Sequence, residues 1–257
     1  MKLSEALSQI FIRGIRMDNI EMDDALARIE NSISSNQPTK VAFINADCVN
    51  IANRSKKYRT DLKDMDMVLV DGVGMRIAGK VLGKPVKDNV NGTDMFPKLC
   101  ALLEKLSGNL FLLGASSDVV ERVAIWVENN YPGVNVVGVQ HGYFDHRDEY
   151  KVVERIRASC ADVLLVALGV PLQEEWIARN MERSGVRIAM GVGGLFDFYS
   201  GRIPRAPLWM RRAGLEWTYR LLQEPGRMWK RYLVGNMIFL IRVFYERIQL
   251  GFRKEIA

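Results

Sequence analysis

The sequence predicts an α/β protein: a Rossmann-like, mostly parallel sheet of about six strands with helices on both faces, followed by a basic, helical C-terminal appendage. Three observations predict it. Compact apolar runs recur between residues 40 and 194, stretches with helical spacing of apolar residues separate them, and the runs end in polar or glycine-rich residues. Apolar strands that alternate with helices are typical of a parallel sheet whose two faces are both covered.

The elements are expected in a simple order along the chain. An amphipathic helix is predicted within 18–35, because Ile20, Ala25, Ile29 and Ile33 recur at roughly helical spacing. Short apolar runs predict the strands, at 40–47, 65–72, 108–116, 133–139, 161–169 and 186–194. Further helices are expected at 93–106, 117–130, 148–159 and 173–183.

The composition is ordinary for a soluble globular protein, with 257 residues of which 48% are apolar and 26% charged. Cys48, Cys100 and Cys160 lie far apart in apolar contexts. This pattern indicates reduced, buried thiols of a cytosolic protein and argues against a disulfide framework or a zinc site. The N-terminal segment lacks the apolar core and the small-residue cleavage site of a secretory signal.

The charge is unevenly distributed along the chain. Residues 202–257 contain 12 Lys/Arg and 4 Asp/Glu, a net charge of +8, whereas residues 1–201 contain 24 basic and 26 acidic residues, a net charge of −2. Three of the five tryptophans also lie in this last segment. We therefore predict an α/β domain at 1–201 and, at 202–257, an appendage that meets an anionic surface, either membrane or nucleic acid.

The carboxyl ends of the predicted strands are polar and glycine-rich, at 45–47, 71–72, 114–116, 140–142, 169–171 and 193–194. Ligands of such sheets bind beyond these ends. Asp71, in the stretch VLVDGVG, ends a buried strand, where desolvation raises a carboxyl pKa and suits a general base. Gly72 and Gly74 would let a substrate approach the backbone closely. A capping or turn aspartate is the alternative.

Three other motifs do not predict a site. Residues 74–81 nearly spell a Walker A loop, but Val81 replaces the magnesium-binding hydroxyl and the segment has a helical pattern. Asp64 and Asp66 form a D-x-D pattern before their strand, at the wrong end of the sheet, which favours a solvated turn. The stretch 141–146 holds both histidines without a strict metal-ligand pattern, so a loop is the preferred interpretation, with His141 left as a hydrogen-bond partner to a ligand.

Taken together, several segments resemble the WecG/TagA/CpsF family of bacterial glycosyltransferases (glycosyltransferase family 26). They include DGVG, NGTD, LGVPLQE, GVGGLFD, RAPLWM and GLEWTYRL, and the resemblance runs from about residue 10 to 236. The matching positions are 45, 71–74, 91–94, 113–115, 142–144, 168–174, 191–197, 205–210, 214–221, 224–227 and 231–233.

The resemblance implies transfer of a sugar from a UDP-sugar to a polyprenyl-diphosphate-linked saccharide, at the cytoplasmic face of the bacterial inner membrane, by a peripheral, inverting enzyme that needs no metal. Asp71 matches the family's proposed base, and Asn45 would help to hold the acceptor or the sugar. The other positions expected to bind substrate are Gly72, Gly74, Asn91, Thr93, Asp94, Gly114, Ala115, Tyr143, Gly169, Gln173, Glu174 and Gly193.

The resemblance also gives the C-terminal appendage a role at the site. Its basic residues would stabilise the leaving diphosphate, at Arg220, Arg227, Lys230 and Arg231. Attraction to anionic lipid is the alternative role, and both can hold together. Residues 236–252 are apolar but interrupted by charges, which predicts an amphipathic helix in the membrane interface; an oligomer-contact helix is the alternative.

Two departures from the family pattern point to a different donor or acceptor: Leu172 replaces a lysine, and Asn89 an arginine. The sequence leaves open the sugar (N-acetylmannosamine, its uronic acid or glucose), the acceptor, the pathway and homo-oligomer formation. A non-catalytic UDP-sugar-binding or scaffold protein of an envelope-assembly complex is the alternative function. Nucleic-acid binding is disfavoured, because the body is slightly acidic and no nucleic-acid motif accompanies the basic segment.

Overall fold

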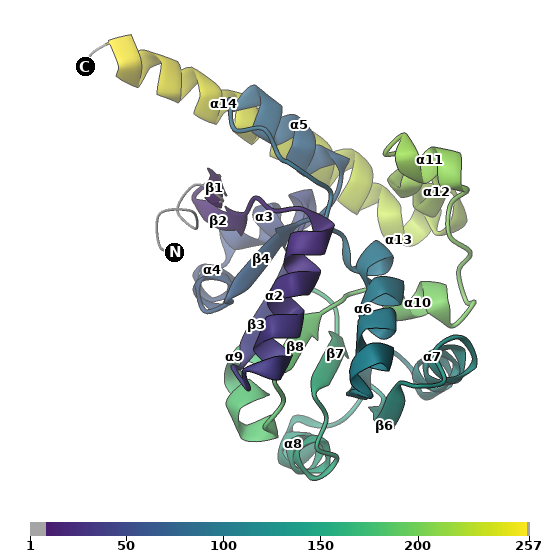
Figure 1. The fold of residues 1–257 in the computed structure, drawn as a ribbon. Coiled ribbons are helices and arrows are strands. Elements are labelled where there is room, and N and C mark those ends of the chain that lie inside the picture. Colours follow the sequence, from purple (N-terminus) through teal and green to yellow (C-terminus); the bar gives the residue numbers. More distant parts are fainter. Residues whose placement is uncertain (1–8, 256–257) are drawn as a thin grey trace.

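A computed structural model of the chain, described for residues 9–255, contains an eight-stranded sheet in the order β1-β2-β4-β3-β8-β7-β5-β6 (Figure 1). All neighbouring strands are parallel except β1 and β2. The predicted α/β class is confirmed, and so are the six predicted strands. They are β3 (Thr39–Ile44), β4 (Met67–Val70), β5 (Asn109–Gly114), β6 (Asn135–Gln140), β7 (Val163–Ala167) and β8 (Ile188–Gly191).

The sequence analysis missed the N-terminal hairpin of β1 (Gln9–Ile12) and β2 (Ile15–Asp18). Its two-residue loop is Arg13-Gly14, with φ of +53° and +72°. Two consecutive left-handed residues are what the tight turn of a two-residue hairpin requires. The signal was the Arg-Gly pair between two short alternating runs, in which the buried side chains include Ile12 and Ile15.

Helices cover both faces of the sheet, as predicted. One face packs on α2 (Met22–Ser34), α6 (Gly92–Leu106), α7 (Ser117–Asn130) and α10 (Leu195–Tyr199). The other packs on α3 (Ala46–Arg54), α4 (Lys56–Lys63), α5 (Val73–Val81), α8 (Glu149–Ala158), α9 (Leu172–Ser184) and α14 (Asn236–Glu255). A short 3₁₀ helix, η1 (His146–Asp148), precedes α8.

The topology opens a crevice between β3 and β8. These strands are parallel neighbours. β3 leads into α3, whose Cys48 is buried under one face of the sheet, whereas β8 leads into α10, whose Phe196 is buried under the other. Connections that leave neighbouring strands toward opposite faces create a crevice at their carboxyl ends, which is where ligands of such folds bind.

The C-terminal segment folds back onto the α/β body. After β8 and α10 it forms α11 (Leu208–Arg212), α12 (Glu216–Gln223), α13 (Pro225–Trp229), the π-helix η2 (Lys230–Gly235) and α14. Figure 1 shows α14 running alongside α5 and continuing past the body. Phe239 and Val243 of α14 are fully buried in the core shared with α3 and α5. The predicted boundary near Gly201 therefore lies between two parts that share one core.

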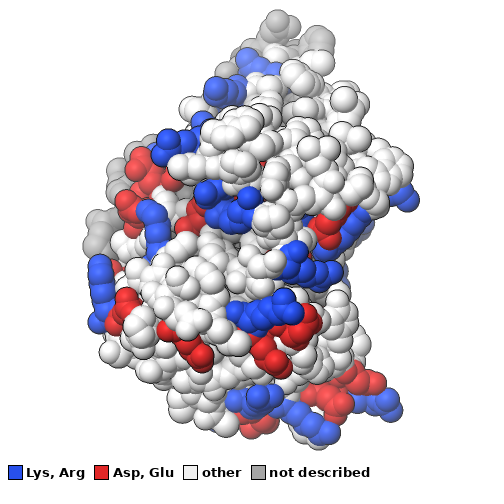
Figure 2. Space-filling view, turned by 90° about the vertical axis from the view of Figure 1, so that its right-hand side faces the viewer, with Lys and Arg blue, Asp and Glu red and all other residues white. Residues whose placement is uncertain are grey.

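Uncharged side chains dominate the part of the surface that the C-terminal segment forms. Figure 2 shows the side that carries α11 and α12, where the upper part is mostly white, with separate blue Lys or Arg side chains among the uncharged ones. The exposed apolar residues of this segment include Trp209, Leu222 and Ile241. Within the described residues, no helix combines the length and the apolar character needed to cross a bilayer.

Candidate active site

A cavity of about 530 Å³ lies at the carboxyl ends of β3, β4, β7 and β8, and the C-terminal segment forms its remaining wall. Most of the residues predicted to form the site line it: Asn45, Asp71, Gly72, Gly74, Asn91, Thr93, Tyr143, Gly169, Gln173, Gly193, Arg220, Arg227 and Arg231. Five others do not: Asp94, Gly114, Ala115, Glu174 and Lys230. The structure thus brings residues from seven parts of the chain to one place.

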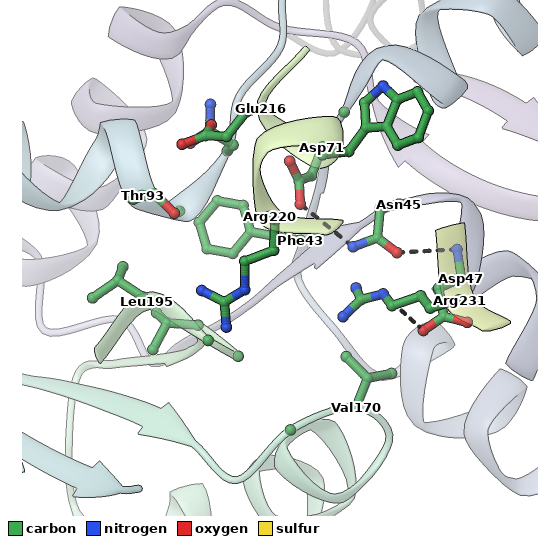
Figure 3. Close-up of a pocket in the computed structure, with 18 of the residues that line it drawn as sticks. Phe43, Asn45, Asp47, Asp71, Thr93, Val170, Leu195, Glu216, Arg220 and Arg231 are labelled. Atoms are coloured by element: carbon green, nitrogen blue, oxygen red, sulfur yellow. Dashed lines mark hydrogen bonds and ion pairs between the residues drawn. The ribbon is translucent and has the colours of Figure 1, made fainter. Parts of the chain in front are cut away.

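Asp71 and Asn45 face each other across neighbouring strand ends (Figure 3). Asn45 is the N-cap of α3, and its Oδ1 accepts the backbone N–H groups of Asp47 at 3.1 Å and Cys48 at 3.2 Å. Because these bonds fix the amide orientation, Nδ2 points at Asp71 and donates to Oδ2 over 3.5 Å. Helix capping therefore presents an amide donor to the Asp71 carboxylate.

The surroundings of Asp71 change its affinity for protons. The residue is reached from the cavity, but protein atoms enclose its carboxyl group on the other sides. Burial raises the pKa of Asp71 above its ordinary value of 3.8, while the hydrogen bond from Asn45 and the charge of Arg231 act in the opposite direction. A carboxylate with a raised pKa is a stronger base than one in water, which suits proton abstraction.

Gly72 and Asn89 shape the start of α5, directly after Asp71. Gly72 is the N-cap of α5 with φ +94°, a conformation that favours glycine, and its N–H donates to Asn89 Oδ1 at 2.5 Å. Asn89 also lines the cavity. The asparagine that departs from the family pattern thus holds the backbone next to Asp71.

Two arginines of the C-terminal segment point into the cavity below Asp71 (Figure 3). Arg220 is only 6% exposed and pairs with Asp197 at 3.1 Å and with Glu224 at 2.8 Å. Its Nη1 is buried without a hydrogen-bond partner. Arg231 pairs with Asp47 at 3.2 Å. The cavity therefore combines a carboxylate base with two guanidinium groups.

The other two basic residues predicted for the site differ from these. The Arg227 side chain is 59% exposed and lies 3.8 Å from Asp197 at the edge of the cavity. Lys230 lies outside the cavity, with its Nζ 5.6 Å from the centre of the Trp229 ring. Of these two basic residues, only Arg227 therefore lines the cavity.

Asp94 does not line the cavity, because its carboxylate faces the C-terminal segment instead. It accepts from Asn91 Nδ2 at 2.8 Å and from Arg205 Nη1 at 2.8 Å, and lies 3.5 Å from Arg211 Nη1. Arg205 also binds Glu216 of α12 at 3.1 Å. Burial raises the pKa of Asp94, but the bond from Asn91 and the two arginines hold it below its ordinary value. Asp94 therefore ties α6 to the segment that closes the cavity.

Replacing Asp94 with asparagine is expected to loosen this attachment. The fold should lose about 1 kcal/mol, since the pairs are partly solvated, and amide hydrogen exchange should quicken in residues 205–216. Exchange measured by mass spectrometry checks this. Asp23→Asn is the matched control, because Asp23 is an exposed residue of α2 that pairs with Lys98 of α6. It should leave exchange in 205–216 unchanged. Equal exchange in the Asp94 variant and the wild type would contradict the attachment.

Two further predicted residues shape the backbone beside the cavity, and a third is enclosed in the protein interior. A Cβ on Gly114 would lie 2.4 Å from the Ala167 carbonyl oxygen, so glycine is needed where β5 meets β7. Ala115 follows with φ +54° and accepts from Gly142 N–H at 2.8 Å. Glu174 is 0% exposed and lies behind Gln173, away from the cavity. A motif match shows that a residue type fits its place, and does not show which way its side chain points.

The structure also adds cavity residues that the sequence analysis did not select: Asp47, Asn89, Glu216, Trp217 and Tyr232. The rings of Trp217 and Tyr232 contact each other edge to face, with centroids 6.0 Å apart. Trp217 and Glu216 lie in the GLEWTYRL stretch, and Asp47 lies two residues after the matching position Asn45, so these stretches held the signal. Their side-chain direction depends on how the C-terminal segment folds back, which periodicity does not reveal.

The three discounted motifs have the local structures that their sequences predict: a helix, a solvent-facing turn and a loop. Residues 74–81 lie in helix α5. Asp64 binds Lys40 Nζ and Asp66 accepts Lys40 N–H, both next to the amino ends of β3 and β4. His141 Nδ1 accepts the N–H of Tyr143 within a loop. Among the residues that the structure describes, no group of three or more His, Cys, Asp or Glu is placed to hold a metal ion.

Comparison with known proteins gives the class and the family. The chain is 32% identical to an N-acetylglucosaminyldiphosphoundecaprenol N-acetyl-β-D-mannosaminyltransferase of Bacillus spizizenii over 214 residues, which is 83% of this chain and 82% of the relative. It is 31% identical to an enzyme of the same name from Staphylococcus aureus over 252 residues, which is 96% of this chain and 94% of the relative. Fold, cavity and relatives together define a glycosyltransferase.

The family model described as "Glycosyl transferase WecG/TagA/CpsF family" matches residues 10–253. The chain belongs to this family, and the resemblance inferred from its motifs is confirmed.

Proposed function

We propose that this glycosyltransferase moves a sugar from a UDP-sugar to a polyprenyl-diphosphate-linked saccharide with inversion at the anomeric carbon. One observation carries the proposal: the Asp71 carboxylate, held by the Asn45 amide, shares a cavity with the guanidinium groups of Arg220 and Arg231. Base and cations are the two kinds of group that such a displacement needs.

The chemistry assigns a role to each group. Asp71 takes the proton of the acceptor hydroxyl, and the acceptor oxygen forms a bond to the anomeric carbon from one face of the sugar. The bond from that carbon to the diphosphate breaks on the opposite face, and UDP leaves with its additional negative charge. Arg220 and Arg231 stabilise this charge, because preorganised cations in an enclosed site act strongly on developing charge.

The relatives suggest the two substrates. Their printed name gives an acceptor, N-acetylglucosaminyl-diphosphoundecaprenol, and a transferred group, N-acetyl-β-D-mannosaminyl. We propose the same acceptor class here, with N-acetylmannosamine as the first donor sugar to test. Its uronic acid and glucose are the next candidates. The cavity of about 530 Å³ is within the range of sites that enclose ligands of this size.

A panel assay tests this proposal. Release of UDP is measured from each UDP-sugar, with and without the polyprenyl-diphosphate-linked acceptor. Acceptor-dependent release from one donor would support the proposal and name the sugar. If no donor gives acceptor-dependent release, the proposal of transfer is contradicted, and UDP binding by the same protein would then favour the scaffold alternative.

The C-terminal segment supplies a surface for reaching a lipid-linked acceptor. Exposed apolar side chains recur every three or four residues along α13, η2 and α14, each between 44% and 61% exposed: Trp229, Leu233, Met237, Ile241, Phe244 and Ile248. This spacing places them on one side of the helical run, and we call them the apolar stripe. Lys230 and Arg247 are exposed on the same run. We propose that the stripe lies in the interface of the cytoplasmic leaflet.

Introducing charge into the apolar stripe is expected to weaken membrane binding. Ile241→Glu with Phe244→Glu should lower partitioning onto anionic vesicles at least about tenfold, since each side chain contributes about 1.5 kcal/mol or more when buried in lipid. The thermal midpoint should not change, because the two side chains are 61% and 53% exposed. Vesicle sedimentation checks this, with Ile125→Glu on α7, 55% exposed, as the matched control.

If the double variant and the wild type bind vesicles equally well, the proposal that the apolar stripe lies in the membrane interface is contradicted. Deleting residues 202–257 is a poorer test, because it also removes Phe239 and Val243 from the protein core.

A further inference from the structure

A buried polar chain lies directly behind the wall of the cavity. Glu174 Oε1 accepts from Gln173 Nε2 at 2.8 Å, and Gln173 Oε1 accepts the N–H of Gly193 at 2.8 Å. Glu174 is 0% exposed and Gln173 is 2% exposed. Gly193 lines the cavity with φ +54°. The chain therefore connects an enclosed carboxyl group to a backbone turn in the cavity wall.

The fit between Gln173 and the end of β8 is close. A Cβ on Gly191 would lie 2.9 Å from Gln173 Nε2 and 3.2 Å from its Cδ, so the amide lies across the strand where only glycine leaves room. A Cβ on Gly194 would lie 3.8 Å from Arg220 Nη2. The turn at Gly193 and Gly194 thus has Gln173 on one side and Arg220 near the other.

Glu174 decides which end of the Gln173 amide faces this turn. An amide has one donor end and one acceptor end, and a carboxylate only accepts. With Nε2 bound to Glu174, Oε1 is left for the Gly193 N–H. In the flipped orientation Oε1 would face the Glu174 oxygen and Nε2 would face the Gly193 N–H, so both bonds would be lost. Without Glu174 only the Gly193 N–H holds the amide in this orientation, so the preference is weaker.

Apart from the bond to Gln173, the only favourable contact of the Glu174 carboxyl group in the described part of the chain is with its own backbone N–H, in the first turn of α9. Among the residues that the structure describes, its buried Oε2 has no hydrogen-bond partner and no cation pairs with it. The groups around it are Cys48 of α3 with Tyr58 and Asp61 of α4, all neutral or acidic. Burial raises the pKa of Glu174 to about 7, opposed by the bond from Gln173. A buried carboxyl group with an unsatisfied oxygen destabilises a fold, and such groups persist mainly where they serve function.

We propose that Glu174 is a positioning residue for transfer: through Gln173 it holds the turn at Gly193 and Gly194 that forms the cavity wall beside Arg220. The inference rests on the proposed function, because that wall would face the donor diphosphate near Arg220. Glu174 itself touches no substrate. Its role makes a prediction that a structural role does not make, namely that activity and stability respond in opposite directions.

The test compares three variants. Glu174→Met removes the acceptor and should lower kcat/KM for transfer about tenfold or more, while the thermal midpoint stays equal or rises. Glu174→Gln keeps an oxygen for Gln173 Nε2 and should retain kcat/KM within about threefold. Gln173→Leu should lose activity, and adding Glu174→Met to it should cause no further loss, since both act through one bond. Activity and stability that fall together in Glu174→Met would overturn the proposal, as would multiplying losses in the double variant.

Amide hydrogen exchange of the protein without substrate separates this inference from the proposed function. Exchange in residues 191–196 should quicken in Glu174→Met and stay as in the wild type in Glu174→Gln. This readout needs no donor or acceptor. If the wild type transfers no sugar, the proposed function fails, but unchanged exchange in Glu174→Met overturns the positioning role alone.

Discussion

Asp71→Asn is expected to lower kcat by about 10²- to 10⁴-fold, the usual contribution of a general base. Asparagine keeps the size and shape of the side chain but does not accept a proton. The fold should survive, because within the described part of the chain Asp71 makes no ion pair and its side-chain bond from Asn45 is long at 3.5 Å. Removing a carboxylate from an enclosed position relieves its desolvation, so the thermal midpoint should be equal or higher.

The control for this variant is Asp64→Asn, which lies at the opposite end of the sheet and binds Lys40. It should leave transfer unchanged. Steady-state rates of UDP release with saturating donor and acceptor provide the measurement. Near-normal turnover by a well-folded Asp71→Asn protein would remove Asp71 from the mechanism and return it to a strand-end aspartate with a structural role.

The pH profile offers a second check on Asp71. A general base works in its ionised form, and burial raises the pKa of this carboxyl group above its ordinary value. Activity should therefore fall as the pH is lowered through a pKa above 3.8, and be fully present at higher pH. An acidic limb at or below the ordinary carboxyl value would contradict the desolvation of Asp71.

The sequence predicted Asp71 and Asn45 correctly as neighbours because the geometry behind the prediction is general. In a parallel sheet the residues that follow the strands share one edge, so polar residues at strand ends meet whatever the loops do. Asp94 lies in the NGTD motif and Glu174 in the LGVPLQE motif, but neither side chain points into the cavity. Their directions depend on partners from distant segments, Arg205 in one case and α3 with α4 in the other, and no local pattern encodes these.

The C-terminal segment shows the same division between local and long-range information. Its change in composition marks the segment, and its periodicity predicts the helix that becomes α14. The burial of Phe239 and Val243 against α3 and α5 is a contact over nearly 200 residues of chain, about the length of a whole domain. That contact holds the C-terminal segment, with Arg220 on α12 and Arg231 on η2, against the body, and no local pattern encodes it, so the two arginines could be suggested only by resemblance.

One helical run therefore serves both the cavity and the apolar stripe. Arg231 points into the cavity from η2, while Trp229 and Leu233 of the same run are exposed on the surface. A protein that inserts the stripe into a leaflet would hold the cavity mouth close to the lipid headgroups. A diphosphate linked to a polyprenyl chain lies at that depth, so its saccharide could reach Asp71 without leaving the membrane.

Replacing Arg220 is expected to have the second largest effect on transfer. Arg220→Gln should lower kcat/KM about 10²- to 10³-fold, as removal of a preorganised charge-stabilising donor does. This variant also removes the ion pair between Arg220 and Asp197. Because breaking a buried ion pair lowers the stability of the fold by about 3 to 5 kcal/mol, a loss of activity in Arg220→Gln could also reflect a less stable protein. Arg220→Lys avoids that confusion, because a lysine keeps the charge beside Asp197 and Glu224 but not the guanidinium fork.

The lysine variant should keep the thermal midpoint within a few degrees of the wild type and still lose at least about tenfold in kcat/KM, since one ammonium group cannot bind the acids and a diphosphate with the same geometry. Arg202→Gln is the matched control: Arg202 also pairs with Asp197, at 3.4 Å, but lies outside the cavity. It should lower stability slightly and leave kcat/KM intact. UDP affinity from calorimetry, measured on all three variants, shows whether the loss arises in binding or in turnover. Equal losses in Arg202→Gln and Arg220→Lys would mean that Arg220 acts only by holding Asp197, and the leaving diphosphate would then need Arg231 as its principal cation.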